Sequence, residues 1–385
     1  MSRVLFVEPP LTGHVNPTVS VARALASRGH EVAWVGHPGA VRPRLPDGAT
    51  LFALSEDVPR AIAVDVTARS QIVRGAAALK FLWEDFFVLL ARSMRPGVAA
   101  AVDGFRPDVL CVDQQTIAGA LVARARGLPW ATLATTSAGV VDPLAGLPQV
   151  QRWLRDVIAE LEREAGLTVS DHGALSPHRV IAFTTAALVG PAENFPPHYR
   201  FVGPATHERP EPAAFPWDQL IDRPRVLVSM GTVNADASER FYRTAVAALA
   251  ELPVQAIVAA PPERVGVVAA PTIVRAFLPQ LAVLAKVDAV ICHAGHNTTC
   301  EALARGLPLV VAPIKDDQPI VADQVVAAGA ALRVKFGRVQ VAELRDAVQR
   351  VLTEPGFRAA ASTIAASFVA AGGAAAAALA VEDLL

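Results

Sequence analysis

The residues with the clearest chemical pattern lie between positions 293 and 301, where the sequence reads His-Ala-Gly-His-Asn-Thr-Thr-Cys-Glu. An apolar run that predicts a buried strand precedes them, and a helical pattern follows. A glycine turn with small hydroxyl residues at a helix N-terminus offers free backbone N–H groups to an anion such as a diphosphate. Asn and Thr are also ordinary helix caps. His293 and Glu301 favour the anion site, because neither residue is needed for a cap.

Two neighbouring segments carry side chains suited to recognising a base and a sugar. Phe277-Leu278-Pro279-Gln280 places an aromatic ring near a carboxamide, as a nucleobase would require. Asp317 and Gln318 pair a carboxylate with a carboxamide, which together accept hydrogen bonds from sugar hydroxyls and donate to them. Taken singly, such residues are more often a core phenylalanine and a capping aspartate.

A further glycine turn, Gly231-Thr232, follows the predicted strand Arg225–Met230. The glycine lets the backbone approach a phosphate closely, and the threonine adds a hydroxyl. A lone glycine turn means little, so this turn matters only together with the other segments.

The order and spacing of these residues resemble the signature segment of the family 1 nucleotide-sugar glycosyltransferases. This family includes plant small-molecule UDP-glycosyltransferases and bacterial macrolide and antibiotic enzymes. The similarity runs from Phe277 to Gln318 through His-x-Gly-x-Asn-Thr-Thr-x-Glu, and it extends over essentially the whole chain. It implies an α/β fold of two tandem Rossmann-like, doubly wound domains that face a cleft, the GT-B architecture.

The resemblance implies a site for a nucleotide-sugar donor in the C-terminal half. Its residues would be Gly231, Thr232, Phe277, Leu278, Gln280, His293, Gly295, His296, Asn297, Thr298, Glu301, Asp317 and Gln318. His293 and Thr298, with the amides around Gly295 and Asn297, would hold the diphosphate.

The same resemblance assigns the other parts of the donor. Phe277 would stack on the base, Glu301 would bind the ribose hydroxyls, and Asp317 and Gln318 would bind the transferred sugar. Phe277 and His296 stand where the plant signature has tryptophan, and the His-His-Gly-Gly form of many bacterial dTDP-deoxysugar enzymes is absent. Because Glu301 suits a vicinal ribose diol, we expect UDP in preference to dTDP.

The N-terminal half contains a histidine and an aspartate at the positions of the family's catalytic pair. His14 lies in the loop 9–17, which is similar to the family's Gly-His-x-x-Pro, at the start of the first predicted helix. The positive end of the helix dipole disfavours imidazolium there and keeps the ring neutral, as a general base requires. Asp113 would orient His14. Without the resemblance, His14 could be polar surface and Asp113 a cap for the helix that begins at Thr116.

The resemblance implies an inverting, metal-independent transfer in which His14 deprotonates an acceptor hydroxyl. The sequence contains no Asp-x-Asp, so that motif implies no divalent cation, and the only cosubstrate is the nucleotide sugar. We expect a hydrophobic natural-product acceptor near Ile72–Met94 and Ala134–Val150. The first of these segments is rich in large apolar residues, namely Phe81, Leu82, Trp83, Phe86, Phe87, Leu89 and Leu90, which would equally suit a core helix.

Other functions are compatible with parts of the pattern. On the same scaffold these are a sugar-nucleotide epimerase or a cell-envelope glycosyltransferase, and outside enzymes a catalytically inactive homologue that binds a nucleotide sugar. A Rossmann oxidoreductase would need Gly-x-Gly-x-x-Gly after the first strand, and Thr12-Gly13-His14 does not supply it.

The hydrophobic pattern predicts the elements that position these residues. Val4–Val7 and Glu31–Gly36 are strand-like, and between them Pro17–Arg28 is helical, with Asn16 as its N-cap. The pattern of strand, helix and strand recurs at 108–134, and the C-terminal half repeats it. Predicted elements there are Arg225–Met230, Ser238–Glu251, Val254–Ala259, Thr272–Phe277, Asp288–Cys292, Asn297–Arg305, Leu307–Ala312, Gln318–Ala328 and Ala330–Val334.

Length and proline content predict the domain organisation. The 385 residues exceed one typical domain of about 100–200 residues. Prolines cluster between positions 203 and 224 and mark a linker. We therefore expect an N-terminal acceptor domain at 1–203, a linker at 204–224, a nucleotide-sugar domain at 225–365 and a C-terminal helix at 366–385 that crosses back to the first domain.

Composition limits the partners and the compartment. With 35 basic and 36 acidic residues, the chain gives no electrostatic reason to bind nucleic acid. The start has no signal-peptide pattern, and the alanine-rich stretch Ile364–Val381 is predicted to be a packed helix, with no integral membrane segment. Cys111, Cys292 and Cys300 lack metal or disulfide spacing and suit buried thiols in the cytoplasm. A homodimer is compatible with the sequence, which leaves the oligomeric state open.

Overall fold

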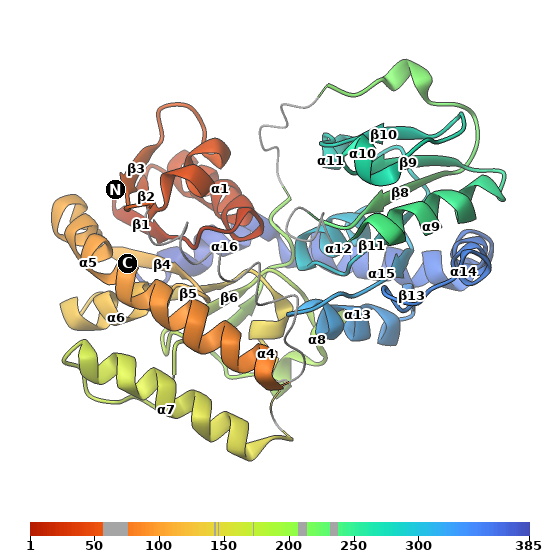
Figure 1. Cartoon of the computed structure of the whole chain (residues 1–385). Helices are drawn as coiled ribbons and strands as arrows, with labels where there is room; N and C mark the ends of the chain where they lie inside the picture. Colours follow the sequence, from red (N-terminus) through yellow and green to blue (C-terminus); the bar gives the residue numbers. More distant parts are fainter. Residues whose placement is uncertain (57–75, 142–143, 145, 172, 207–213, 232–237) are drawn as a thin grey trace. The chain divides into compact units, whose positions relative to one another are not determined.

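The computed structural model describes residues 1–385 apart from 57–75, 142–143, 145, 172, 207–213 and 232–237 (Figure 1). It divides into two compact units. The first unit comprises Met1–Phe183, Pro191–Arg209 and Ala371–Leu385, and the second comprises Thr184–Gly190 and Pro210–Ala370.

The first unit is built on a parallel sheet whose strand order, within the described residues, is β3-β2-β1-β4-β5-β6-β7. The strands are β1 (Arg3–Val7), β2 (Glu31–Gly36), β3 (Thr50–Ala53), β4 (Val109–Asp113), β5 (Trp130–Ala134), β6 (Arg179–Ala182) and β7 (Tyr199–Phe201). Alternate residues of β1 enter different cores: Val4 and Phe6 join one, and Leu5 and Val7 the other. The central strands are thus buried on both faces, which explains their continuous apolar runs.

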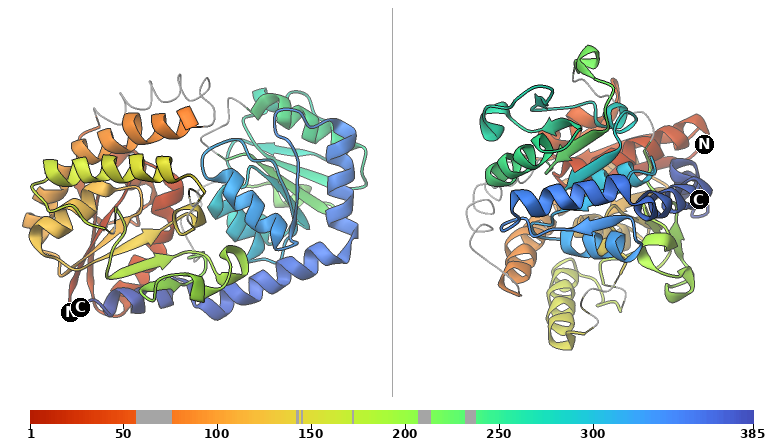
Figure 2. Two further views of the ribbon diagram at one scale, coloured as in Figure 1. Left: turned by 90° about the horizontal axis from the view of Figure 1, so that it is seen from below. Right: turned by 90° about the vertical axis from the view of Figure 1, so that its right-hand side faces the viewer.

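Helices cover both faces of this sheet (Figure 2). They are α1 (Thr12–Ser27), α2 (Pro38–Val41), α4 (Ala76–Phe81), α5 (Val88–Phe105), α6 (Ile117–Arg126), α7 (Pro148–Glu164) and α16 (Gly373–Glu382), with a π-helical turn η2 at Leu82–Phe87 and short 3₁₀ turns η1 (Arg42–Arg44), η3 (Ser137–Gly139) and η4 (Ala192–Asn194). Helices α1 and α16 share one core with the sheet, and α5 and α6 share the other. The chain ends lie on the same side of this unit in Figures 1 and 2.

The first helix begins earlier than the sequence predicted. The N–H groups of His14 and Val15 both donate to the Leu11 carbonyl, so α1 starts at Thr12 and Pro17 lies inside it. The assignment of Asn16 as the N-cap was therefore wrong. Proline has no N–H to donate, and a helix tolerates this missing hydrogen bond near its start. His14 therefore lies in the first helical turn.

The C-terminal stretch forms two helices in place of the single one predicted. Helix α15 (Pro355–Ala371) ends and α16 begins at Gly372 and Gly373, whose φ angles of 86° and 56° are left-handed and break the helix. The Gly373 N–H donates to the Val202 carbonyl at 2.7 Å. Helix α16 packs on α1, and Glu382 accepts hydrogen bonds from Arg28 at 2.6 Å and 2.7 Å. These contacts fix the end of the chain to the first unit.

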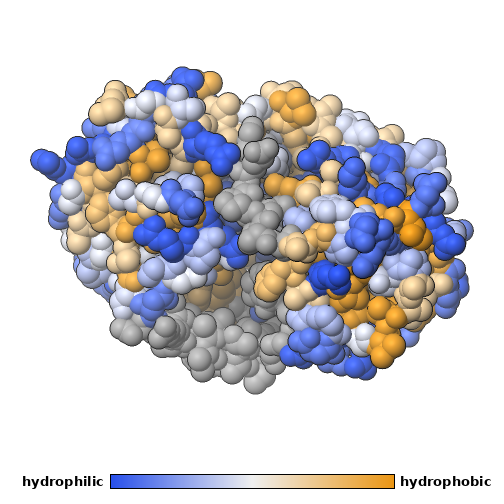
Figure 3. All heavy atoms as spheres, turned by 90° about the horizontal axis from the view of Figure 1, so that it is seen from above, coloured by the Kyte–Doolittle hydropathy of each residue, from blue (hydrophilic) through white to orange (hydrophobic). Residues whose placement is uncertain are grey.

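The same stretch, Pro355–Glu382, is long and apolar enough to pass a length-and-hydropathy test for a membrane span, and 44% of its most apolar window is buried in the protein. Ala377, Ala378 and Val381 belong to the core shared with α1. On the face shown in Figure 3, hydrophilic and hydrophobic residues are interspersed. The stretch thus contributes core residues, as predicted for a packed helix.

The second unit contains a parallel sheet with the order β10-β9-β8-β11-β12-β13. Its strands are β8 (Arg225–Ser229), β9 (Gln255–Ala259), β10 (Ile273–Arg275), β11 (Ala289–Cys292), β12 (Leu309–Val311) and β13 (Ala331–Arg333), and its helices are α8 (Ala186–Val189), α9 (Glu239–Ala250), α10 (Pro262–Val265), α11 (Gln280–Leu284), α12 (His296–Leu303), α13 (Gln318–Ala327), α14 (Val341–Thr353) and α15, with a 3₁₀ turn η5 (Trp217–Gln219). This order repeats that of the first six strands of the other sheet. The prediction of two tandem Rossmann-like halves is confirmed.

Candidate active site

Polar side chains of the first unit meet where the chain leaves β1 and β4. In a doubly wound sheet these two neighbouring strands send their following helices to opposite faces, which opens a crevice at their carboxyl ends. His14, in the first turn after β1, lies against Asp113, the last residue of β4, with Nδ1 and Oδ2 2.9 Å apart. The Asp113 side chain is fully buried, and that of His14 keeps 15% of its surface exposed. The structure thus forms the predicted pair.

A threonine that the sequence analysis did not single out completes this network. Thr135 Oγ1 donates to Asp113 Oδ2 at 2.6 Å and lies 2.7 Å from His14 Nδ1. Asp113 Oδ1 accepts the Gln115 N–H at 2.8 Å, so the aspartate also holds the turn before α6. Because both neighbours of Nδ1 are acceptors for its hydrogen, the proton of neutral His14 belongs on Nδ1. Nε2 is left with the lone pair that a base uses.

Glu8 is a second carboxyl group beside Asp113. Val7 pairs with Val112 on the neighbouring strand, so the next residues, Glu8 and Asp113, lie side by side. Glu8 is fully buried, and neither of its carboxyl oxygens has a hydrogen-bond partner within the described structure. Burial raises the pKa of Glu8 well above its usual range, and the charge of Asp113 adds to the shift. Burial and the neighbouring carboxylate thus both favour the protonated form of Glu8.

The buried Glu8 predicts a pH-dependent stability. The folded chain binds this proton more tightly than the unfolded chain, so the stabilisation is complete below about pH 4 and is lost as pH rises towards the raised pKa. Within that interval the free energy of unfolding should fall by up to about 1.4 kcal/mol per pH unit relative to Glu8→Gln. Chemical denaturation at pH 5, 6, 7 and 8 measures this difference.

The matched control for this measurement is Glu193→Gln, which changes an exposed glutamate of the same unit. It should leave the pH dependence of the wild type unaltered. If the curves of the wild type and Glu8→Gln ran parallel over this range, Glu8 would not be the group that titrates.

In the second unit the corresponding crevice lies at the ends of β8 and β11 and contains His293. The imidazole lies between two glycines: a Cβ added at Gly231 or Gly295 would approach His293 Nε2 to 2.7 Å or 2.4 Å. Gly231, which has a φ of 75°, therefore makes room for the histidine, a role that the sequence did not reveal. Burial lowers the pKa of His293, against smaller opposing effects of the charge of Asp317 and the Ser229 backbone. Thr232, predicted beside Gly231, lies outside the described residues.

The turn after β11 leads directly into helix α12. The N-cap is Gly295, and it provides no side-chain cap, so Asn297 and Thr298 lie in the first turn and are not caps. The first N–H groups of a helix have no acceptor within it. His296 is buried, with Nε2 3.6 Å from the Sγ atom of Cys300. The His296 side chain is therefore buried beside Cys300 of the same helix, and the turn offers an anion its backbone N–H groups and the Thr298 hydroxyl.

Gln280 and Glu301 are joined by a hydrogen bond. Gln280 Nε2 donates to Glu301 Oε2 at 2.5 Å and lies 3.4 Å from Thr298 Oγ1. Leu278 packs against the core, whereas 71% of the Phe277 surface is exposed. The structure thus brings Gln280, Thr298 and Glu301 together and leaves an aromatic ring open to solvent three residues before Gln280.

The turn before α13 contains the remaining predicted residues. Gln318 Oε1 accepts the N–H groups of Ile314 and Lys315 at 2.9 Å and 3.2 Å, so its carbonyl fixes the turn. Asp317 is the N-cap residue but makes no side-chain cap bond. Asp316 adopts a left-handed φ of 58°, and burial raises the pKa of its carboxyl. The alternative interpretation of Asp317 as a capping aspartate is therefore wrong.

The predicted acceptor segments are only partly described, because 57–75, 142–143 and 145 lie outside the described residues. In the first segment Phe87 and Leu90 are buried in the cores, and Leu89 is exposed. Trp83 and Phe86 each contact Phe87 edge-on, with ring centroids 5.2 Å and 5.3 Å away. Much of this segment is therefore core, as the alternative interpretation expected.

Two Rossmann-like units, one with a partly buried His–Asp pair and the other with a glycine-flanked histidine before a helix, define the class of the GT-B glycosyltransferases. A model of the family "UDP-glucoronosyl and UDP-glucosyl transferase" matches residues 214–366. The chain is 31% identical to 4'-demethylrebeccamycin synthase of Lentzea aerocolonigenes, over 94% of each protein. The chain therefore belongs to the family 1 glycosyltransferases, among enzymes of the antibiotic and natural-product type.

Solved structures agree with this assignment. The glycotransferase of kitacinnamycin superposes with a TM-score of 0.78 and 26% identity, covering 100% of this chain and 99% of the other. The spinosyn rhamnosyltransferase SpnG superposes with a TM-score of 0.79 and 26% identity, covering 100% of both. SpnG has also been solved with thymidine diphosphate and with the spinosyn aglycone. The predicted GT-B architecture is confirmed.

Proposed function

We propose that this chain is an inverting, metal-independent glycosyltransferase that moves a hexose or deoxyhexose from a UDP- or dTDP-sugar to a hydroxyl of a hydrophobic natural-product acceptor. The observation that carries the proposal is the network of His14, Asp113 and Thr135. It favours the tautomer with the hydrogen on Nδ1, in which Nε2 carries the lone pair of a base, and it provides a buried carboxylate for the imidazolium that forms. The acceptor oxygen attacks the anomeric carbon as its proton passes to Nε2, and the nucleoside diphosphate leaves from the opposite face.

The donor half of the proposal rests on the second unit. Departure of a nucleoside diphosphate develops negative charge, which preorganised N–H and O–H donors stabilise. The first turn of α12 and the Thr298 hydroxyl offer such donors. His293 Nδ1 is buried at the same turn and has no hydrogen-bond partner within the described structure.

Support for the remaining parts of the donor comes from geometry and from relatives. Glu301, held by Gln280, presents a carboxylate suited to ribose hydroxyls, and exposed Phe277 offers a ring face to a base. The matched family is named for UDP-sugar transfer, whereas SpnG has been solved with thymidine diphosphate. We favour UDP because Glu301 suits the ribose diol. The dissociation constants of UDP, dTDP and GDP, measured by titration calorimetry, test this preference.

Thr298→Val is expected to weaken UDP or dTDP binding about 10- to 100-fold, because a hydrogen bond to a charged group contributes about 1.5–3 kcal/mol. Valine keeps the shape of threonine and removes the hydroxyl. Titration calorimetry measures the dissociation constant, and thermal melting verifies the fold. The control is Thr299→Val, because fully buried Thr299 lies 4.0 Å from Cys292 Sγ and away from the turn surface. Equal dissociation constants for wild type and Thr298→Val would contradict the phosphate site.

The transfer itself is tested with UDP-α-glucose and a polyphenolic aglycone. Mass spectrometry of the mixture should show an aglycone one hexose heavier, and the proton NMR coupling at the anomeric carbon should show the β-glycoside. An α-glycoside would contradict single displacement. Release of glucose alone, with the acceptor unchanged across UDP- and dTDP-sugars, would contradict transfer.

A further inference from the structure

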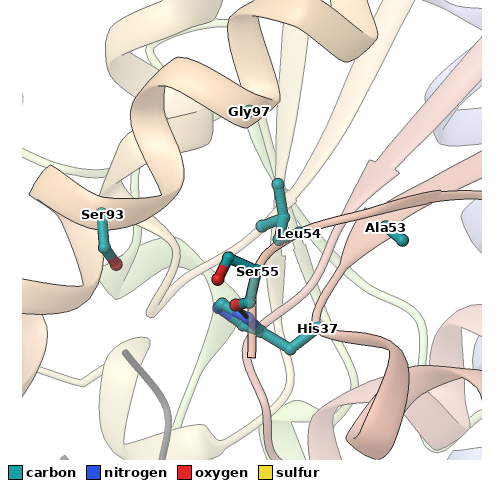
Figure 4. Close-up of a pocket in the computed structure, with 6 residues that line it drawn as sticks. All are labelled: His37, Ala53, Leu54, Ser55, Ser93 and Gly97. Atoms are coloured by element: carbon teal, nitrogen blue, oxygen red, sulfur yellow. Dashed lines mark hydrogen bonds between the residues drawn. The ribbon is translucent and has the colours of Figure 1, made fainter. Parts of the chain in front are cut away.

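A pocket of about 230 Å³ lies in the first unit (Figure 4). It is lined by His37, Ala53, Leu54, Ser55, Ser93 and Gly97. These residues come from the turn after β2, from β3 and the turn after it, and from α5. The described residues of the lining include no carboxylate, ammonium or guanidinium group, which favours an uncharged ligand.

His37 supplies an unused hydrogen-bond acceptor. Its residue surface is 2% exposed, and Nδ1 lies 2.7 Å from the Ser55 carbonyl oxygen. A carbonyl only accepts, so the hydrogen is on Nδ1 and Nε2 carries a lone pair. Nε2 is buried and has no partner within the described structure. Burial lowers the pKa of His37, against smaller opposing effects of the Ser55 carbonyl and Glu56, so the ring stays neutral.

Ser93, which also lines the pocket, can accept a hydrogen bond as well. Ser93 Oγ donates its hydrogen to the Leu90 carbonyl at 3.0 Å, which leaves the oxygen lone pairs for a ligand. In Figure 4 the Ser93 hydroxyl faces the space beside Ser55 and the His37 ring, and Leu54 supplies an apolar wall. A buried acceptor without a donor costs about 1–3 kcal/mol. A ligand that brings an O–H or N–H into this pocket would remove that cost.

The pocket lies at the same edge of the sheet as the loop that contains His14. His37 and Ser55 follow β2 and β3, so they lie at the carboxyl edge of the sheet, the edge from which the His14 loop also leaves. Strand β2 pairs with β1, and the Glu8 N–H donates to the Val35 carbonyl at 3.1 Å. Neighbouring strands are about 4.8 Å apart. One extended small molecule can therefore reach both places.

We propose that this pocket is a subsite for one ring of the acceptor, a ring that carries a neutral hydroxyl or N–H which donates to His37 Nε2. The volume suits a single ring and is below the roughly 300 Å³ at which pockets for whole drug-sized ligands begin. The larger part of the acceptor therefore lies outside the pocket. Calling the ligand an acceptor rests on the proposed function, whereas the preference for a neutral donor rests on the pocket alone.

The test measures binding of 4-fluorophenol and 4-fluoroanisole to the full chain by ¹⁹F NMR, without nucleotide. The two rings differ in that only the phenol donates a hydrogen bond. We expect the phenol to bind about 3- to 10-fold more tightly, the effect of one neutral hydrogen bond. His37→Leu should remove this preference and leave anisole binding unchanged. His178→Leu, which alters an exposed histidine before β6 at the opposite edge of the sheet, should keep the preference.

A second variant keeps the test decisive if His37→Leu does not fold. Ser93→Leu fills the pocket from α5 without touching His37 and should abolish binding of both probes. Equal affinity of the two probes for the wild type, or a phenol preference that survives His37→Leu, would overturn the proposal. Because no sugar is transferred in these measurements, their outcome is independent of the proposed reaction. If the probes bind as expected but phenol does not compete with an accepted aglycone, the pocket is real and its assignment to the acceptor is wrong.

Discussion

Replacing His14 by alanine is expected to lower kcat for glycosyl transfer by about 10²- to 10⁴-fold, the usual contribution of a general base. In the structure His14 Nδ1 is held by Asp113 and Thr135, and Nε2 has the lone pair that takes the acceptor proton. The nucleotide is expected to bind to the second unit, so the dissociation constant of UDP or dTDP should stay unchanged. Steady-state kinetics and calorimetry on the same preparation measure the two quantities.

Two controls separate the loss of a base from a general defect. His178→Ala changes an exposed histidine of the same unit and should retain wild-type kcat. Thermal melting is the second, because His14→Ala should melt like the wild type if only the base is lost. A variant that lost nucleotide binding in proportion to kcat would show that His14 is not the base.

Replacing Asp113 by asparagine is also expected to have a large effect and to lower kcat by about 10²- to 10⁴-fold. Asparagine can keep the hydrogen bond from the Gln115 N–H through its oxygen. Its NH₂ group then faces Nδ1 and Thr135 Oγ1 and donates where the carboxylate accepted. The histidine proton is driven to Nε2, which blocks the base, and the negative charge that stabilises imidazolium is lost.

The comparison of single and double variants checks whether the two residues act together. Residues of one catalytic unit have non-additive effects. His14→Ala with Asp113→Asn should therefore be about as slow as the worse single variant, and Thr135→Val should be less harmful than either. Activity near wild type in Asp113→Asn, or losses that multiply in the double variant, would contradict the pair.

Patterns local in sequence were predicted well. The limits of β2 match the prediction residue for residue, because buried strands leave continuous apolar runs. The predicted strand Thr272–Phe277 is shorter, at Ile273–Arg275, so Phe277 lies beyond it. Strands β3, β6 and β7 were not predicted. The three cysteines are buried free thiols, as expected.

The errors concern where helices begin and end. The pair Asn16-Pro17 predicted a helix start, but the N–H groups of His14 and Val15 already donate to the Leu11 carbonyl, so the helix begins earlier. The alanine-rich C-terminal stretch looked like one helix, but Gly372 and Gly373 break it and its second part packs on α1. Propensity is a weak prior, and packing decides such cases.

By itself, the sequence predicted the two α/β halves, the family resemblance and the candidate site residues of both halves, because hydrophobic periodicity and motif spacing are local properties of the chain. Only the tertiary structure decided what those residues touch. It joined Thr135 to the pair of His14 and Asp113, placed Glu8 beside Asp113 and seated His293 between Gly231 and Gly295. It also left His37 Nε2 without a partner at a pocket. These contacts bring together residues far apart in the chain, and strand order and side-chain packing, which set them, leave no signal in a single sequence.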